Sequence, residues 1–427
     1  MKLGQIYADP ETVETVVEAI AAEDRRSEYA RFFEKYPSLL SVRLFGRTWE
    51  LSSFALFVVI GAILALLLLR HESRRSGLKK GTVSTLAVLL PPLGLVFAHA
   101  FYVLASPGLY AENPSGILSL WEGGYAMWGA FIGFIPAVLL AARISREKVS
   151  ALFDACAAPA ALFVAVCRFA SYPFSGEGKG RPLVENTVFA RFPFAVTEDG
   201  AWFCAVFLLE ALFALVILHF TLASPRKGGD KARLFLILYS ASQILCESLY
   251  GDSGKMVWHQ FVRVPMLACA VALVILFIAG ILRRAPDSSR LPGGRIAGLS
   301  AALLHSILLI IGMEFAISKL PIWPVWADYL IIADCCFLLG YAVYRAALPP
   351  LRSGAALRGQ RIAEAVYVLL HGIAFILGAV FVAGTYARNE QTIFPDWACW
   401  IVIADACLFG GCAIYCLVRR GKGAGRA

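Results

Sequence analysis

The chain has 427 residues, of which 59% are hydrophobic and only 16% are charged, and its mean hydropathy is +0.70. About a quarter of the residues of an average soluble domain are charged, so this composition excludes a soluble globular protein and indicates an integral membrane protein. The net charge of +9 comes from short Lys and Arg clusters between apolar runs, which is the pattern of orientation signals and argues against a nucleic-acid partner.

The N-terminal segment, residues 1–45, lacks the basic, apolar and small-residue stretches of a cleaved signal peptide. Residues 12–30 have helical periodicity and mixed charge, which favours a short amphipathic helix on the outer surface. A solvated arm with no role is the alternative.

Eleven apolar segments follow, each long enough to cross a bilayer core, which takes roughly 20 residues of helix. They are residues 51–70, 82–105, 125–144, 149–169, 201–221, 232–250, 261–282, 296–317, 327–347, 362–384 and 397–418. The sequence therefore predicts an all-α, polytopic membrane protein with about 11 transmembrane helices.

Basic clusters follow every second span. They comprise Arg70, Arg74, Arg75, Lys79 and Lys80; Arg143, Arg146 and Lys148; Arg226, Lys227, Lys231 and Arg233; Arg283, Arg284, Arg290 and Arg295; Arg352, Arg358 and Arg361; and Arg419, Arg420, Lys422 and Arg426. Because cytoplasmic loops carry the excess of Lys and Arg, we expect the N-terminus outside and the C-terminus in the cytoplasm.

The 11 cysteines lie almost entirely within apolar runs and lack the spacing of a zinc site. We expect them to be small apolar residues in helix packing, and we expect no metal site.

The last third of the chain contains a duplication. LLHSILLIIG (303–312) matches LLHGIAFILG (369–378), and IIADCCFLLGYAVYR (331–345) matches VIADACLFGGCAIYC (402–416). The pattern predicts two parallel helical hairpins after a Gly- and Pro-rich linker. Its polar residues are His305, His371, Asp334 and Asp405; hydrogen bonding across helices is the favoured interpretation, and a proton or ion path is the alternative.

The stretch CRFASYPFSGEGKGR (167–181) combines two arginines, one carboxylate and several glycines at the outer end of the fourth span. Arg168 at a helix C-terminus is also typical of a snorkelling side chain. Arg181 adds a second guanidinium suited to phosphate, and Glu177 between them could orient the arginines or move a proton. The glycines let the backbone approach a ligand. The stretch lacks the spacing of a nucleotide phosphate loop.

Further polar residues lie inside spans: His99 in the second, Glu210 in the fifth, and Gln243 with Glu247 in the sixth. Gln243 and Glu247 are four residues apart and share a helical face. Spans rarely carry so many polar groups unless they line a cavity, so a shared polar cavity is favoured over separate structural hydrogen bonds.

Seven segments in chain order resemble the prolipoprotein diacylglyceryl transferase family, over roughly residues 38–284. They are LFGRTWELSSFALF (44–57), VFAHAFYVL (96–104), ILSLWEGGYAMWGAFIG (117–133), CRFASYPFSGEGKGR, FLLEAL (207–212), QILCESLYGD (243–252) and HQFVRVPM (259–266). The family's fold has seven spans with the N-terminus outside and the C-terminus inside, in agreement with the orientation expected here.

The resemblance implies transfer of the diacylglyceryl group of phosphatidylglycerol to the lipobox cysteine thiol of a prolipoprotein. Glycerol phosphate leaves, no metal or cofactor is needed, and the reaction takes place at the outer side of a bacterial plasma membrane. By position, Arg168 and Arg181 hold the phosphate, Glu177 orients them or relays a proton, and Glu210 and Glu247 organise the cavity. The residues implied as catalytic are Arg168, Glu177, Gln243 and Glu247, and those implied in phospholipid binding are His99, Arg168, Ser171, Arg181, Glu210 and Gln260.

The chain departs from the family pattern at six positions. Trp128 stands where the family has a histidine, and His99 stands where it has its second-span arginine. Ala170 and Ser171 stand in place of the signature glycine and asparagine. Gln243 stands in place of the catalytic sixth-span arginine, and Tyr250 in place of a further arginine. Glutamine carries no charge, and loss of one charge-stabilising donor costs about a hundred- to a thousandfold in rate.

Three hypotheses follow for the function: a divergent transferase, a catalytically inactive relative that binds anionic phospholipid or lipoprotein precursor, and a transporter built around the repeat. The expected organisation is an N-terminal segment 1–45, a seven-helix domain 46–284, a linker 285–295 and a four-helix extension 296–427.

Overall fold

A computed structural model describes residues 38–44, 47–107, 110, 114–118, 124–183, 193–198, 200–250, 257–259, 262–284, 296, 299–300, 302–307, 310 and 325–348. Within these ranges, seven helices are long and apolar enough to cross a membrane. They are α2 (Ser53–Arg75), α3 (Lys80–Ala105), α5 (Met127–Ser145), α6 (Val149–Ser175), α7 (Val206–Ala223), α8 (Asp230–Tyr250) and α9 (Val264–Arg284). A short 3-10 helix, η1 (Pro114–Leu118), lies between α3 and α5, and α11 (Val325–Ala347) follows α9.

The first seven predicted spans are confirmed as helices. Residues 362–384 and 397–418 lie outside the described residues, so the total of eleven stays a prediction. These seven helices indicate a multi-pass membrane protein, and any further passes stay a prediction.

Three small antiparallel sheets add to the expected all-α architecture. β1 (Ser38–Leu44) pairs with β2 (Arg47–Ser52), β5 (Ala201–Cys204) lies between β3 (Pro182–Leu183) and β4 (Ala195–Glu198), and β6 (Val257–His259) pairs with β7 (Val262–Arg263). The fifth and seventh spans therefore begin later than predicted, because their first apolar residues belong to β5 and β7. Short apolar runs do not distinguish strand from helix in sequence.

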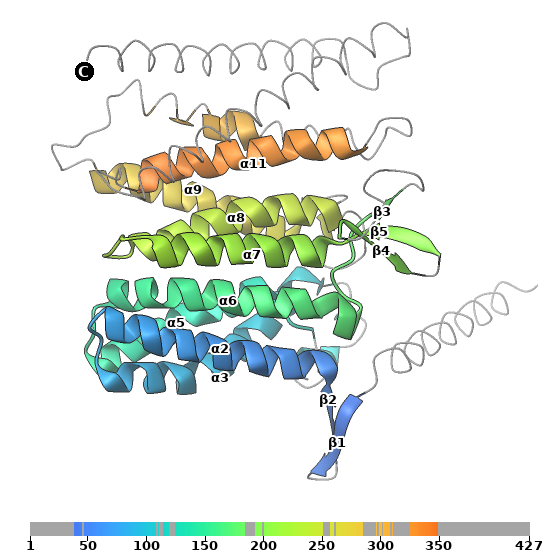
Figure 1. Cartoon of the computed structure of the whole chain (residues 1–427), viewed down its shortest axis with the longest axis horizontal. Helices are drawn as coiled ribbons and strands as arrows, with labels where there is room; N and C mark the ends of the chain where they lie inside the picture. The colour runs from blue at the N-terminus through green and yellow to red at the C-terminus, as the bar shows by residue number, and fades with distance from the viewer. Residues whose placement is uncertain are drawn as a thin grey trace, which may run out of the picture.

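The helices lie side by side, and the β1–β2 and β3–β5–β4 sheets stand at the same end of the bundle (Figure 1). We call this end, where α6 and α8 finish and α7 and α9 begin, the strand end. The opposite end holds the connections from α2 to α3, α5 to α6 and α7 to α8. The β1–β2 hairpin also joins residues on both sides of the boundary expected at residue 45, since Leu44 pairs with Arg47.

Helices α3 and α5 touch through glycines in the segment WGAFIG. A Cβ atom on Gly129 would lie 2.4 Å from the Phe97 carbonyl oxygen, and one on Gly133 would lie 2.5 Å from that of Leu93. Small residues four apart on one helix face let two membrane helices approach to backbone contact. This contact explains the tryptophan–glycine segment structurally.

A buried carboxylate fixes the start of α8 against α6. Asp154 accepts hydrogen bonds from the backbone N–H groups of Gly229, Lys231 and Ala232 at 2.8, 2.9 and 3.0 Å. A carboxylate at this position satisfies the free N–H groups of the first turn. The Lys231 ammonium in turn donates to Glu72 of α2 at 2.9 Å. Three helices are thereby fixed to one another at the end opposite the strands.

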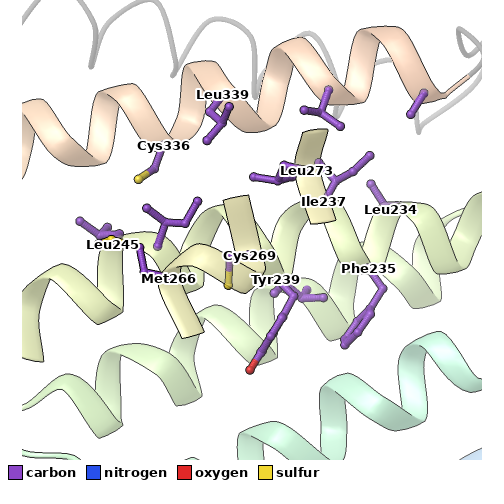
Figure 2. Close-up of a cluster of buried hydrophobic side chains, with 14 of the residues drawn as sticks. Leu234, Phe235, Ile237, Tyr239, Leu245, Met266, Cys269, Leu273, Cys336 and Leu339 are labelled. Carbon is purple, nitrogen blue, oxygen red and sulfur yellow. The ribbon is translucent and has the colours of Figure 1, made fainter. Parts of the chain in front are cut away.

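The largest hydrophobic cluster joins α8, α9 and α11 (Figure 2). Leu234 and Ile237 of α8 and Leu273 of α9 pack with Cys336 and Leu339 of α11. Close to the end of α11, a Cβ on Gly280 would lie 2.5 Å from the Ala347 Cα, so the two backbones nearly touch. The first described helix of the C-terminal extension therefore packs directly on the seven-helix part.

Large apolar side chains remain exposed along the outer helices, including Leu56, Val59, Ile63 and Leu67 of α2. An apolar surface of this extent fits lipid chains rather than water. Seven cysteines are described, all with free thiols, and six of them are buried, which confirms their role as small packing residues there. Of the repeat, Asp334 is buried in α11 and His305 lies in a helical segment, whereas His371 and Asp405 lie outside the described residues.

Candidate functional site

Arg168 lies within α6 rather than at its end. The helix continues to Ser175, seven residues further, which is about 10 Å along the axis at 1.5 Å per residue. The expected span end near residue 169 is thus too early, and helix-end snorkelling does not describe this side chain. Its Nε lies 3.2 Å from Glu210 Oε2 on α7, an ion-pair distance whose angle falls short of a hydrogen bond.

The Glu210 carboxylate is the acceptor around which three helices meet. Only 2% of its side chain is exposed. Besides its ion pair with the Arg168 guanidinium, the carboxylate accepts hydrogen bonds from the Gln243 amide at 2.5 Å and from the Tyr250 hydroxyl at 2.8 Å. A buried carboxylate needs such partners, because its desolvation is otherwise costly.

The Gln243 amide links two carboxylates. Its Nε2 group donates to Glu210 at 2.5 Å and to Glu247, one helical turn further on α8, at 3.2 Å. An amide nitrogen has two protons, so both bonds can form together. The structure therefore brings Glu210, Gln243 and Glu247 into one hydrogen-bonded network, whereas the shared cavity expected around them stays a prediction.

A second guanidinium, that of Arg263, binds the other oxygen of Glu247 and forms the end of the network. Arg263, in β7 directly before α9, donates from Nε to Glu247 Oε2 at 2.6 Å. Its guanidinium carbon stands 5.0 Å from the centre of the Tyr250 ring, a cation–π contact. The resulting row, Arg168–Glu210–Gln243–Glu247–Arg263, is buried at the strand end of the bundle, and we call it the polar row.

Sequence reasoning missed Arg263. It stands in a segment that resembles the family, but nothing in its spacing indicates a contact with α8, because β6 and β7 form the turn that brings it back. A hint was available: Arg263 is the single charged residue inside the predicted span 261–282.

The glycine-rich loop after α6 is fixed by its backbone. Gly176 ends α6 in the left-handed conformation, with φ of 69°. Gly178 accepts from the Phe207 N–H at 2.9 Å, and a Cβ there would lie 2.7 Å from the Cβ of Phe207. Gly180 would bring a Cβ within 2.6 Å of the Leu249 carbonyl oxygen. These glycines are required for contact with α7 and α8, which is a different reason from the ligand approach expected from the sequence.

Two charged residues of this loop, Arg181 and Glu177, are predicted site residues. Arg181 is half-buried, and its backbone N–H donates to Leu249 of α8 at 2.9 Å. Glu177 is exposed to the surroundings. Their side-chain roles stay predictions.

The structure gives positions for two of the other residues that are predicted to bind phospholipid. The Ser171 hydroxyl donates to the Arg168 carbonyl at 2.8 Å and lies under Gly178. Both ring nitrogens of His99 face backbone carbonyls, 3.0 Å from Gly124 and 3.1 Å from Ile117, so His99 connects α3 to the segment before α5. Gln260 lies outside the described residues.

Trp128 belongs to an aromatic cluster. Its ring centre lies 6.0 Å from those of Phe131 and Tyr239. Tyr239 is on α8, one turn before Gln243, so the indole supports the helix that carries the polar row. The correspondence of Trp128 with the family's histidine stays a prediction.

The chemistry available to the polar row follows from its charges. Its two ends are guanidiniums, the two carboxylates lie between them on either side of the Gln243 amide, and the Nε of each guanidinium faces a carboxylate. Held in this way, the terminal nitrogens of each arginine suit an anionic, multi-oxygen ligand. Within the described ranges, no three His, Cys, Asp or Glu side chains are close enough to hold a metal ion.

Comparison with known proteins gives one family. The family model for prolipoprotein diacylglyceryl transferase matches residues 42–282. The phosphatidylglycerol–prolipoprotein diacylglyceryl transferase of Bacillus licheniformis is 28% identical over 232 residues, which is 52% of this chain and 86% of that protein. The enzyme of the same name from Bacillus velezensis is 28% identical over 238 residues, covering 54% and 87%. That from Oceanobacillus iheyensis is 25% identical over 248 residues, covering 56% and 85%.

Proposed function

The family match spans more than half of the chain, so the protein belongs to the prolipoprotein diacylglyceryl transferase family, and on this premise we propose that it is a transferase of that type. It transfers the diacylglyceryl group of phosphatidylglycerol to the lipobox cysteine thiol of a prolipoprotein, in the plasma membrane of a bacterium. The observation that carries the proposal is the buried polar row, where guanidiniums held by carboxylates stand between apolar helices.

The proposed reaction exchanges one bond for another. The cysteine sulfur attacks the diacylglyceryl carbon next to the phosphate, a C–S bond forms, and the C–O bond to phosphate breaks. Glycerol phosphate leaves with the bonding electron pair, and the thiol proton passes to a carboxylate. The thiolate is the reactive form of the nucleophile.

The residues of this chain divide these tasks. Arg168 and Arg181 hold the phosphate and stabilise the charge that grows on it as it leaves. Glu210 holds the Arg168 guanidinium in place through a contact of 3.2 Å, and Glu247 holds that of Arg263 through a contact of 2.6 Å. Glu177, exposed in the loop between the two phosphate-binding arginines, is the proposed proton acceptor.

The distribution of basic residues supports the orientation. The connections opposite the strand end carry Lys79, Lys80, Arg146 and Lys148, and Arg226 and Lys227 add to them. Because basic connections are retained in the cytoplasm, the strand end with the polar row lies toward the outer leaflet, where exported prolipoproteins arrive. The N-terminus is then outside, and residues 296–427 form an additional membrane extension.

The decisive experiment uses a bacterial host whose own transferase is depleted. The full chain is expressed with a reporter prolipoprotein, and the reporter cysteine is examined by mass spectrometry. We expect the mass of one diacylglyceryl group on the cysteine, lost in Arg168→Ala. An unmodified cysteine beside abundant, membrane-inserted protein would overturn the proposal.

A second function is favoured by the neutral Gln243, because the family resemblance implies a catalytic arginine at this position. An inactive relative would bind phosphatidylglycerol or the precursor without releasing glycerol phosphate. Purified protein in proteoliposomes distinguishes the two, because release of glycerol phosphate that depends on an added lipobox peptide occurs only with the transferase.

A further inference from the structure

Arg263 is a buried cation with part of its hydrogen-bonding capacity unused. The residue is 7% exposed, its Nε donates to Glu247 at 2.6 Å, and its flat guanidinium faces the Tyr250 ring. Among the described residues, its Nη1 nitrogen is buried and has no hydrogen-bond partner. Buried side-chain nitrogens are nearly always paired, so an unpaired one on a fixed guanidinium indicates a place for an acceptor.

The polar row needs this cation if it is to receive an anion. Without Arg263, the half-buried Arg168 and the buried Glu210, Gln243 and Glu247 sum to one negative charge, because glutamine is neutral. A phosphate would then approach an excess carboxylate at short range in a medium of low dielectric constant. With Arg263 the row is neutral before the ligand binds, and both of its ends are guanidiniums.

We propose that Arg263 is a phosphate-binding residue of this protein and supplies the second cation of the polar row, in addition to Arg168 and to Arg181 of the loop. The inference rests on the proposed function and names a ligand-contacting residue for it. Arg263 and Arg168 each direct Nε to a carboxylate, and the buried Nη1 of Arg263 remains for a phosphate oxygen of phosphatidylglycerol.

This position also accounts for Gln243. The resemblance implies an arginine at 243, on α8, where this chain has an amide between two carboxylates. The side chains of 243 and 263 both contact Glu247, one from within α8 and the other from β7. A cation at either position neutralises the same carboxylate, so the charge has moved from helix to strand without leaving the site.

Kinetics in proteoliposomes test the inference. Phosphatidylglycerol is the donor, a synthetic lipobox peptide is the acceptor, and released glycerol phosphate is measured. We expect Arg263→Gln to lower kcat/KM for phosphatidylglycerol about a hundred- to a thousandfold, as for other single charge-stabilising donors. Adding Gln243→Arg to that variant should raise kcat/KM at least tenfold again, and a merely structural role of Arg263 would not give this rescue. Wild-type KM and kcat in a folded Arg263→Gln protein would overturn the inference.

Two controls keep the outcome interpretable. Arg283→Gln removes an arginine that pairs with Asp230 at 2.9 Å, at the other end of α9, and should leave the kinetics unchanged. If Arg263→Gln does not fold, the double substitution Arg263→Met with Glu247→Met removes the pair without leaving a buried charge. Wild-type turnover in that double variant would equally overturn the inference.

Lipid binding separates this inference from the proposed function. Native mass spectrometry of the purified chain in mixed phosphatidylglycerol and phosphatidylcholine counts the lipids that stay bound. If the wild type shows no turnover but retains phosphatidylglycerol preferentially, and Arg263→Gln loses that preference, the transferase proposal fails and the binding role of Arg263 stands. Equal preference in both proteins removes the binding role, whatever the turnover.

Discussion

The ion pair between Arg168 and Glu210 should contribute strongly to stability, and Arg168→Met tests this. The charges are 3.2 Å apart, so at an effective dielectric constant of about 20 their attraction is about 5 kcal/mol. The variant leaves a carboxylate that is 2% exposed, with hydrogen bonds from Gln243 and Tyr250 but without its cation. Breaking a buried pair on one side costs about 3–5 kcal/mol. The Arg168 side chain is 21% exposed, which places the expected loss near 3 kcal/mol.

The companion variant is Arg168→Met with Glu210→Gln. The glutamine carries no charge: its carbonyl oxygen can accept from the Gln243 amide, and its NH2 group can donate to the Tyr250 hydroxyl in place of the bond lost there, so the double variant should regain about 2 kcal/mol relative to Arg168→Met. Unfolding is followed in mixed SDS micelles with a thiol-reactive fluorescent dye. Six of the seven described cysteines are buried, so the dye reports the loss of helix packing.

A surface pair provides the control. Lys179 and Glu198 are 2.5 Å apart, but their side chains are 38% and 15% exposed. Lys179→Met should therefore cost less than about 1 kcal/mol. If Arg168→Met is no less stable than Lys179→Met, or if the double variant is as unstable as Arg168→Met, the buried pair does not have the energetic role argued for it.

Three further predictions concern the surroundings of the polar row. Gly180→Ala should lower transferase activity at least tenfold, because its Cβ would stand 2.5 Å from a side-chain carbon of α7 and 2.6 Å from a carbonyl oxygen of α8. Gly94→Ala is the control and should be neutral, because a Cβ there would have nothing within 4 Å. The activity of both variants is measured by glycerol phosphate release. Tyr250→Phe removes one hydrogen bond to the Glu210 carboxylate and should cost about 1.5–3 kcal/mol of stability in the same dye assay, while unchanged stability would show the bond to be dispensable. Burial raises the pKa of the Cys204 thiol to about 11, so its alkylation by iodoacetamide should be slow at pH 8 and accelerate toward pH 11; fast labelling of the folded protein at pH 8 would contradict this.

Local sequence patterns predicted much of the framework. Apolar run length places the first seven helices, and the four-residue spacing of Gln243 and Glu247 places both on one face of α8, where the structure has them. Sequence did not resolve the strands. In β5, the short apolar run 201–204 continues into α7 without a break in hydropathy, and only pairing with β3 and β4 sets it apart.

By itself, the sequence determined that this is a multi-span membrane protein, and it identified Glu210 and Glu247 as polar residues inside spans that favour a shared polar cavity. Those inferences depend on composition and on contacts within one helix, which are local. Only the tertiary structure decided which charges are partners. Arg168 meets Glu210 from another helix, and Arg263 meets Glu247 through the turn between β6 and β7. An ion pair depends on distance in space, and that distance is set by how α6, α7, α8 and β7 pack together. Hydropathy and spacing along the chain do not encode this packing.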